Sequence, residues 1–304
     1  MDFEPIYIKL HRTGELTERV SKAVDMLKEC KFCPRECAVN RLNVEKGFCR
    51  SGRLAMISSV GPHFGEEPPL VGRHGSGTIF FTNCNLDCVF CQNYDISHAG
   101  DGREISSDQL ADAMLALQSL GCHNINFVTP THYAPQILEA LIIAIEKGLN
   151  VPLVYNCGGY ESLEIIKLLD GIVGIYMPDI KYGDNEIAEK YSNAPNYFSI
   201  VKSVVAEMHR QVGDLVVNKQ GTAEKGLLIR HLVMPNGLAG TDKVVDFVSK
   251  LSKNSYINIM AQYRPQYKAS NYPELNRRIT TNEYVDAILL AEKAGLTRGF
   301  RHER

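Results

Sequence analysis

The chain has 304 residues, of which 44% are hydrophobic and 22% are charged, and its formal net charge is −2. This composition is typical of a globular protein and excludes a strongly basic chain that coats nucleic acid. The start of the sequence lacks the apolar core of a signal peptide, and the longest apolar run, ALIIAI, is too short to cross a bilayer. We therefore expect a soluble, cytoplasmic protein without a membrane or nucleic-acid partner.

The first 76 residues are predicted to be an irregular, Cys-rich extension of the protein, and residues 77–304 its main domain. The extension contains a predicted helix at 15–28 and a stretch rich in proline and glycine, GPHFGEEPPLVGRHGSG (61–77), which is typical of a loop. His63, Glu66 and Glu67 lie in that stretch. They could cover a site in the main domain, but a solvated loop is the preferred interpretation.

Short apolar runs and amphipathic helical patterns alternate from residue 77 onward. The runs are 78–81, 124–128, 152–155, 171–177, 227–233 and 256–260, and the helical patterns are 107–120, 134–147, 162–169, 186–211, 240–252 and 281–295. Strands that are each followed by a helix predict a parallel sheet with right-handed crossovers. We expect an α/β fold, a partial (β/α)6 barrel with an irregular N-terminal Cys-rich extension.

Polar segments follow the ends of these predicted strands. They are Cys84, the VTPTH turn (128–132), NCGG (156–159), PDIKY (178–182) and MPNG (234–237). Because ligands bind at the carboxyl ends of parallel strands, we expect these segments to share one mouth. Residues 262–278, which are rich in tyrosine, form either a substrate or partner loop at this mouth or a surface tail around the bottom of the barrel.

Nine cysteines are present, and seven of them fall into two groups. In a cytoplasmic protein, clustered cysteines indicate metal binding more often than disulfides. Of the two single cysteines, Cys122 is expected to pack as a small hydrophobe, and Cys157 lies where it could contact a substrate. His231, inside a predicted strand, is expected to be buried and hydrogen-bonded.

The second cysteine group lies in CNLDCVFCQN (84–93), directly after GTIFF, with the spacing C-x3-C-x2-C. Three thiolates on a four-iron cluster leave one iron open to another ligand. A tight zinc loop or three buried thiols are the alternatives. With its aromatic residue before the last cysteine, the segment resembles the radical S-adenosylmethionine (SAM) superfamily. The resemblance implies that Cys84, Cys88 and Cys91 are catalytic and hold a [4Fe–4S] cluster, that SAM binds the open iron, and that Phe90 lies near its adenine.

Further segments resemble the pyruvate formate-lyase activating enzymes within that superfamily, over about residues 77–262. PDIKY implies that Lys181 contacts the methionine end of SAM and that Asp179 helps to hold a monovalent cation. IRHLVMPN points to Arg230, and NCGG points to Asn156. CPRECAVNR, EEPP, GSGTIFF and CVFCQNY bring the chain closest to an uncharacterised branch related to these enzymes.

Two departures from that family concern the cofactor and the substrate. Many relatives have Gly-Gly-Glu after the second strand, where this chain has VTPTH, so Thr129, Thr131, His132 or another residue is expected to contact SAM instead. CGGYE (157–161) offers two glycines and Glu161 one strand later. The sixth strand ends in MAQYRPQYK, without the histidine of well-known activating enzymes.

The first cysteine group, Cys30, Cys33, Cys37 and Cys49, has spacing typical of a metal site. Structural zinc is slightly favoured, because the group lies outside the barrel pattern. The alternatives are a second iron–sulfur cluster, or a free thiol, Cys49, that acts on a radical intermediate.

Three functions are compatible with these features. The first is a radical SAM oxidoreductase that receives an electron from a flavodoxin or ferredoxin and abstracts hydrogen from a glycyl residue of a partner protein. The second is a radical SAM enzyme that modifies a small molecule or a nucleotide. The third is a non-catalytic electron-transfer or metal-binding module. The number of β/α units and their shared mouth favour an enzyme.

Overall fold

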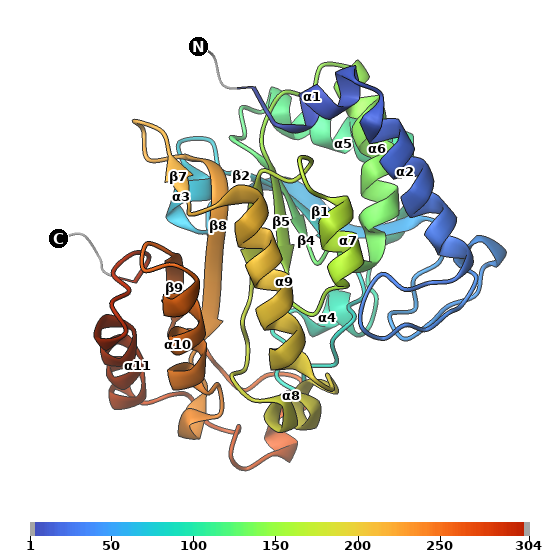
Figure 1. The fold of residues 1–304 in the computed structure, drawn as a ribbon. Helices are drawn as coiled ribbons and strands as arrows, with labels where there is room; N and C mark the ends of the chain where they lie inside the picture. Colours follow the sequence, from blue (N-terminus) through green and yellow to red (C-terminus); the bar gives the residue numbers. More distant parts are fainter. Residues whose placement is uncertain (1–3, 301–304) are drawn as a thin grey trace.

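The computed structural model describes residues 4–300 and contains one mixed sheet with helices packed around it (Figure 1). Six parallel strands form its main part, in the order of the chain: β2 (Ser76–Phe81), β4 (Ile125–Val128), β5 (Leu153–Cys157), β6 (Ile175–Pro178), β8 (Ala223–Leu232) and β9 (Tyr256–Met260). No pairing joins β2 to β9 among the strands described. The predicted partial (β/α)6 barrel is therefore confirmed.

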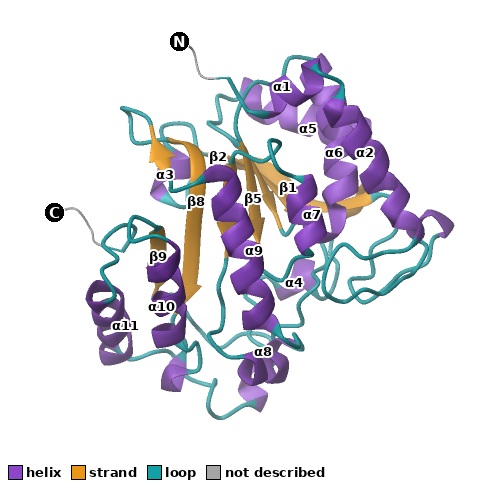
Figure 2. Cartoon of the chain, viewed as in Figure 1, coloured by secondary structure: helices purple, strands orange, loops and turns teal. Residues whose placement is uncertain are grey.

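Helices follow each parallel strand and lie outside the sheet (Figure 2). They are α5 (Ser107–Ser119), α6 (Ala134–Glu146), α7 (Leu163–Leu168), α8 (Asn185–Ser192), α9 (Tyr197–Val212), α10 (Thr241–Leu251) and α11 (Thr281–Lys293). Ser106 begins α5 with a capping box to Gln109, and Thr280 begins α11 in the same way with Glu283. None of the helices between residues 4 and 300 combines the length and the apolarity that a membrane-spanning helix needs.

The predicted single helix at 186–211 is wrong, because the structure divides it into α8 and α9. Asn193 and Asn196 take left-handed backbone conformations, with φ of 47° and 57°, and Pro195 lies between them. Asparagine tolerates this conformation, and the residue before a proline is disfavoured in a helix. The break turns the chain so that α8 ends beside the cysteine loop that follows β2.

The prediction of an irregular segment up to residue 76 is also wrong in part. β1 (Ala55–His63) pairs antiparallel with β2 and with the short β3 (Arg103–Ile105), and α3 (Pro68–Val71) follows. His63 pairs with Ser76, the first residue of β2. The segment between them therefore lies at the amino ends of the parallel strands, opposite the mouth. Leu70 of α3 packs there among barrel side chains.

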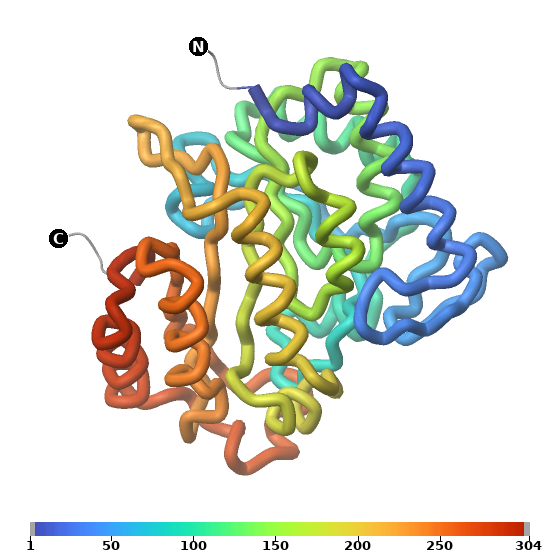
Figure 3. Tube along the Cα trace, viewed as in Figure 1, coloured from blue at the N-terminus to red at the C-terminus, as the bar shows by residue number. Residues whose placement is uncertain are grey.

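The N-terminal helices pack on the outside of the barrel. α1 (Tyr7–Arg12) buries Tyr7 in the main hydrophobic core, α2 (Glu15–Asp25) buries Leu16 and Ala23 there, and α2 contacts α6. The Tyr7 hydroxyl donates to the carbonyl of Val151 at 2.9 Å. After α2 and the short helix η1 (Met26–Lys28), the Cys-rich segment forms the long loop seen in Figure 3. A domain boundary at residue 76 stays a prediction.

The Tyr-rich segment 262–278 lies at the mouth, so the alternative of a tail around the barrel bottom is wrong. Lys268 N donates to the carbonyl of Val89 at 2.9 Å, and the Gln92 side chain donates to the carbonyl of Gln262 at 3.2 Å. The segment contains one short helix, η5 (Ala269–Asn271). These contacts hold it across the cysteine loop.

Candidate active site at the carboxyl ends of the strands

A cavity of about 270 Å³ opens at the carboxyl ends of the parallel strands. The cavity brings together predicted site residues and their neighbours from several strand ends and from the cysteine loop. These residues are Cys84, Cys88, Phe90, Cys91, Thr129, Asn156, Cys157, Gly158, Asp179, Lys181 and Arg230. Apolar side chains complete the wall: Phe81, Leu86, Ile96, Val128, Leu232 and Met260. The mouth predicted from the strand ends therefore exists, and it joins polar groups to an apolar wall.

The loop that carries the three cysteines is fixed by the end of α8. Asp87 N donates to the carbonyl of Ser192 at 3.0 Å, and Val89 N donates to that of Tyr191 at 2.9 Å. On the other side, a β-carbon at Gly158 would lie 2.8 Å from a methyl group of Leu86. A side chain at residue 158 would force this methyl group to move, so the glycine suits the close approach of the chain after β5 to the cysteine loop.

Each of the three cysteine sulfurs lies within hydrogen-bonding distance of one donor. Cys84 Sγ accepts from the backbone N–H of Leu86 at 3.4 Å, and Cys88 Sγ accepts from the Ser192 hydroxyl at 3.0 Å. The Ser97 hydroxyl lies 3.1 Å from Cys91 Sγ. Sulfurs that ligate iron commonly receive such bonds.

The donor set fits a cluster of iron ions. Burial raises the pKa of Cys84 to about 12 and that of Cys88 to about 11, and the nearby Lys181 opposes the shift at Cys88. Thiolates at these positions therefore need a further cationic partner, which iron supplies. Cys84, Cys88 and Cys91 would each hold one iron of a four-iron cluster and would leave the fourth iron open to another ligand.

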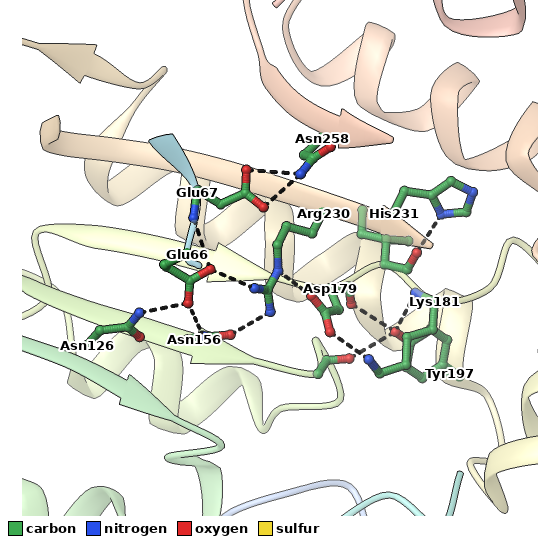
Figure 4. Close-up of polar contacts among 12 residues, drawn as sticks. Glu66, Glu67, Asn126, Asn156, Asp179, Lys181, Tyr197, Arg230, His231 and Asn258 are labelled. Carbon is green, nitrogen blue, oxygen red and sulfur yellow. Dashed lines mark hydrogen bonds and ion pairs between the residues drawn. The ribbon is translucent and has the colours of Figure 1, made fainter. Parts of the chain in front are cut away.

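A network of charged side chains joins the cavity to the interior of the barrel (Figure 4). Asp179 accepts from Lys181 Nζ at 2.6 Å and from Arg230 Nε at 2.7 Å. Arg230 Nη2 also donates to Asn156 Oδ1 at 2.8 Å. Although burial raises it, the pKa of Asp179 is held at about 2 by Arg230 and Lys181. The carboxylate is thus ionised and fixes both cations at the cavity.

Glu66 and Glu67 belong to this network, so their assignment to a solvated loop is wrong. Glu66 Oε1 lies 3.1 Å from Arg230 Nη1, and its other oxygen accepts from the amides of Asn126 at 3.0 Å and Asn156 at 3.3 Å. Glu67 is 6% exposed and accepts from Asn258. Both carboxylates enter the barrel from the end opposite the mouth, so they do not cover it.

Thr131, His132 and Glu161 lie outside the cavity lining. The His132 ring is buried, Nε2 lies 2.9 Å from the carbonyl oxygen of Thr82, and burial lowers the pKa of the ring to about 3. The Thr131 hydroxyl donates to Glu161 at 2.8 Å, and the Tyr155 hydroxyl donates to the other carboxyl oxygen at 3.0 Å. Of Thr129, Thr131 and His132, the residues expected from the sequence to replace the Gly-Gly-Glu contact with SAM, only Thr129 lines the cavity.

Cys122 and His231 are buried, as predicted. Cys122 packs in the hydrophobic core. His231 is fully buried, with Nδ1 2.7 Å from the carbonyl oxygen of Ile180 and Nε2 2.9 Å from the Thr241 hydroxyl. These partners fix one neutral form of the ring. His231 therefore supports the end of β8 and does not face the cavity.

The first cysteine group is folded into a compact loop beside the barrel. Cys30, Cys33 and Cys49 are buried; burial raises the pKa of Cys30 and of Cys33, and the nearby Cys49 raises both further. Cys37 Sγ accepts from the N–H of Phe48 at 3.3 Å, which brings the two ends of the loop together. Arg41 ties the loop to the barrel, because its guanidinium donates to the backbone carbonyl of His132 at 2.7 Å.

Within residues 4–300, no group of three or more His, Cys, Asp or Glu side chains is arranged so that it could hold one metal ion. The metal assignments at Cys30, Cys33, Cys37 and Cys49 and at Cys84, Cys88 and Cys91 therefore stay predictions.

Comparisons with known proteins agree with the motif and the fold. Residues 78–218 match the family model described as the radical SAM superfamily. The uncharacterized protein MJ0674 of Methanocaldococcus jannaschii is 39% identical over 287 residues, which cover 91% of this chain and 78% of that protein.

Solved structures show similarity in fold at low sequence identity. A crystal structure of HydG, a maturase of the [FeFe]-hydrogenase, has a TM-score of 0.50 at 12% identity and covers 73% of this chain and 50% of its own. HydG from Carboxydothermus hydrogenoformans has a TM-score of 0.49 at 14% identity, over 70% and 49% of the two chains. The chain thus spans about half the length of these structures. A [4Fe–4S] cluster and SAM are typical of the matched family, and the chain belongs to the radical SAM superfamily.

Proposed function

We propose that the chain holds a [4Fe–4S] cluster on Cys84, Cys88 and Cys91 and cleaves SAM reductively in the adjoining cavity. The observation that carries the proposal is that one cavity joins all three sulfurs to Asp179, Lys181 and Arg230. When bound, the cluster supplies the electron that cleaves SAM to methionine and a 5′-deoxyadenosyl radical. That radical would abstract a hydrogen atom from a substrate.

The residues around the cavity have the chemistry to bind and orient SAM. Lys181 uses one of its ammonium protons on Asp179, so two remain for a carboxylate of a ligand. The Thr129 hydroxyl and the Asn156 amide add neutral polar groups at the same wall. The apolar side chains that complete the wall exclude water, which strengthens each of these polar contacts.

For the substrate, we propose a glycyl residue of a partner protein, as in the activating enzymes. The support is the position of the motif residues: Asp179 and Lys181 form an ion pair at the cavity, and Arg230 and Asn156 are hydrogen-bonded beside them. A flavodoxin or ferredoxin would supply the electron. Anaerobic incubation with SAM, a reductant and candidate glycyl-radical enzymes is the test, and a glycyl signal in electron paramagnetic resonance is the expected result.

One observation favours the alternative of a small-molecule substrate. Gln262 lines the cavity, and the segment that follows it is hydrogen-bonded to the cysteine loop through Val89 and Lys268. One side of the mouth is therefore covered, which suits a small ligand better than a protein loop. Cleavage of SAM without a glycyl signal, together with deuterium transfer from a labelled metabolite into 5′-deoxyadenosine, would replace the glycyl substrate with a small molecule.

A further inference from the structure

The hydroxyl groups of Ser192 and Ser97 lie beside two of the three cysteine sulfurs, and neither serine belongs to the cysteine motif. Ser192 is the last residue of α8, 104 positions from Cys88 in the sequence, and Ser97 ends the short helix α4 (Tyr94–Ser97). Both serines are buried, at 0% and 9% exposure. The hydrogen bond from Ser192 to Cys88 is therefore shielded from water, which makes it stronger, whereas the contact between Ser97 and Cys91 is partly buried.

We propose that Ser192, oriented by Tyr182, and Ser97 are positioning residues that raise the reduction potential of the cluster by donating hydrogen bonds to its cysteine ligands. This inference rests on the proposed cluster at Cys84, Cys88 and Cys91. It assigns a function to three side chains that the cysteine motif does not include.

The direction of the hydrogen bonds follows from the chemistry of the sulfur. A thiolate bound to iron has no proton, so Cys88 Sγ accepts and the Ser192 hydroxyl donates, at 3.0 Å. The Ser192 oxygen can still accept, and the Tyr182 hydroxyl lies 2.6 Å away. Tyr182 thus donates to Ser192, which donates to Cys88. Bonds in such a chain strengthen one another.

The surrounding residues fix this chain of donors. Tyr182 is fully buried and packs edge-on against Phe90 and Tyr197, with ring centroids 6.3 Å and 5.6 Å away. It follows Lys181 directly, so the segment that directs Lys181 into the cavity also places the tyrosine. The backbone carbonyl of Ser192 accepts from Asp87 N, which holds α8 against the cysteine loop.

Ser97 is held independently of α8. Its N–H donates to the carbonyl of Asn93 at 2.9 Å, and its own carbonyl accepts from Arg50 Nη2 at 3.1 Å. Its hydroxyl lies 3.1 Å from Cys91 Sγ, which accepts for the reason given for Cys88. Cys84 receives its bond from a backbone N–H, which substitution of a side chain leaves in place. Two of the three bonds can therefore be removed one at a time.

Hydrogen bonds to the sulfurs stabilise the reduced cluster more than the oxidised one, because reduction adds a negative charge. We expect loss of either hydroxyl to lower the equilibrium constant for one-electron reduction about tenfold, which corresponds to about 59 mV for a one-electron couple. Tyr182→Phe should give a smaller shift in the same direction, because Ser192 keeps its hydroxyl but loses the donor that orients it.

The experiment is a redox titration, followed by electron paramagnetic resonance, of the reconstituted full-length protein and its variants Ser192→Ala, Ser97→Ala and Tyr182→Phe. Ser249→Ala is the matched control, because this buried serine donates to Asp246 in α10 and lies in a helix that does not carry the cysteines. Iron and sulfide are measured in every sample. A role in packing alone would change cluster content without changing the potential.

Lower midpoint potentials in both serine variants at full iron content, with Ser249→Ala unchanged, are the expected result. Potentials equal to that of the wild type would overturn the inference, and so would loss of the cluster from both serine variants, which would indicate a structural function. A wild-type protein that binds no four-iron cluster would instead contradict the proposed function, so the two failures can be distinguished.

Discussion

Glu66 Oε1 lies 3.1 Å from Arg230 Nη1 inside the barrel, although 164 residues separate the two in the sequence. The segment before the first parallel strand thus reaches from the amino ends of the strands to a side chain at the cavity. Arg230 in turn contacts Asp179 and Asn156. The residues proposed to bind SAM are therefore held by Glu66 from the amino ends of the strands as well as by their own strands.

Glu66→Gln is expected to destabilise the protein by about 2 kcal/mol, because a mostly buried guanidinium loses one of its two ionised partners. Urea unfolding of the two proteins under identical conditions measures the difference. Glu104→Gln, at an exposed position of β3, is the control. Equal stability of the two variants would show that the ion pair contributes nothing.

Lys181→Met should weaken SAM binding at least about tenfold, because it removes the ammonium group from the cavity but keeps a side chain of similar length. Equilibrium dialysis of the reconstituted protein with labelled SAM gives the dissociation constant. Lys190→Met provides the comparison, because this exposed lysine pairs with Glu274 instead. The same dissociation constant in both variants would remove Lys181 from the proposed site.

Glu161 is expected to make stability depend on pH. Burial raises its pKa from 4.5 to about 7, although Thr131 and Tyr155 donate hydrogen bonds to it. The folded protein therefore binds this proton more tightly than the unfolded chain, so stability falls as the pH rises from about 4.5 to about 7 and then levels off.

Glu161→Gln should reduce the loss of unfolding free energy between pH 5.5 and pH 8 by about 2 kcal/mol, since the amide remains neutral throughout. Urea unfolding at the two pH values checks this result. An unchanged difference between the two pH values would mean that Glu161 does not titrate in this range. The Glu104→Gln variant again serves as a control for an exposed carboxyl group.

The Cys-rich loop is expected to bind a metal of its own, with structural zinc preferred, and its thiols would have to move together to ligate it, because among residues 4–300 they do not surround one metal position. Its four thiols lie in one compact loop with little apolar core, so a metal would supply much of its order. Metal analysis of a variant with Cys84, Cys88 and Cys91 all replaced by alanine isolates this group. Zinc near one per chain is expected. About four irons would indicate a second cluster, and a metal-free protein would contradict a metal site there.

Periodicity and motif spacing in the sequence predicted the six parallel strands and many of the residues that share the cavity, although no residue of MPNG (234–237) lines it. The reason is geometric: parallel strands end at one edge, so residues that follow them meet there whatever the helices between them do. The position of a residue after a strand end does not, however, predict the direction in which its side chain points. Thr131 and His132 also follow a strand end, yet they turn toward Glu161 and Thr82.

Three other features differ in whether the sequence indicates them. Pro195, between two asparagines, indicates the break between α8 and α9, although the helical periodicity on either side of it suggests one helix. No local pattern distinguishes Glu66 from a carboxylate on a solvated loop, because its burial depends on Arg230, far away in the sequence. Ser192 is missed for the same reason, since its contact with Cys88 exists only in the folded chain.

The measurement that tests the central claim most directly is the release of 5′-deoxyadenosine. The protein is reconstituted anaerobically with iron and sulfide, then mixed with SAM and dithionite, beside Cys88→Ala and the core control Cys122→Ala. We predict release by the wild type and by Cys122→Ala, and none by Cys88→Ala, which lacks one of only three cluster ligands. Iron-replete wild-type protein that releases no 5′-deoxyadenosine, or a Cys88→Ala variant that releases as much as the wild type, would contradict the account.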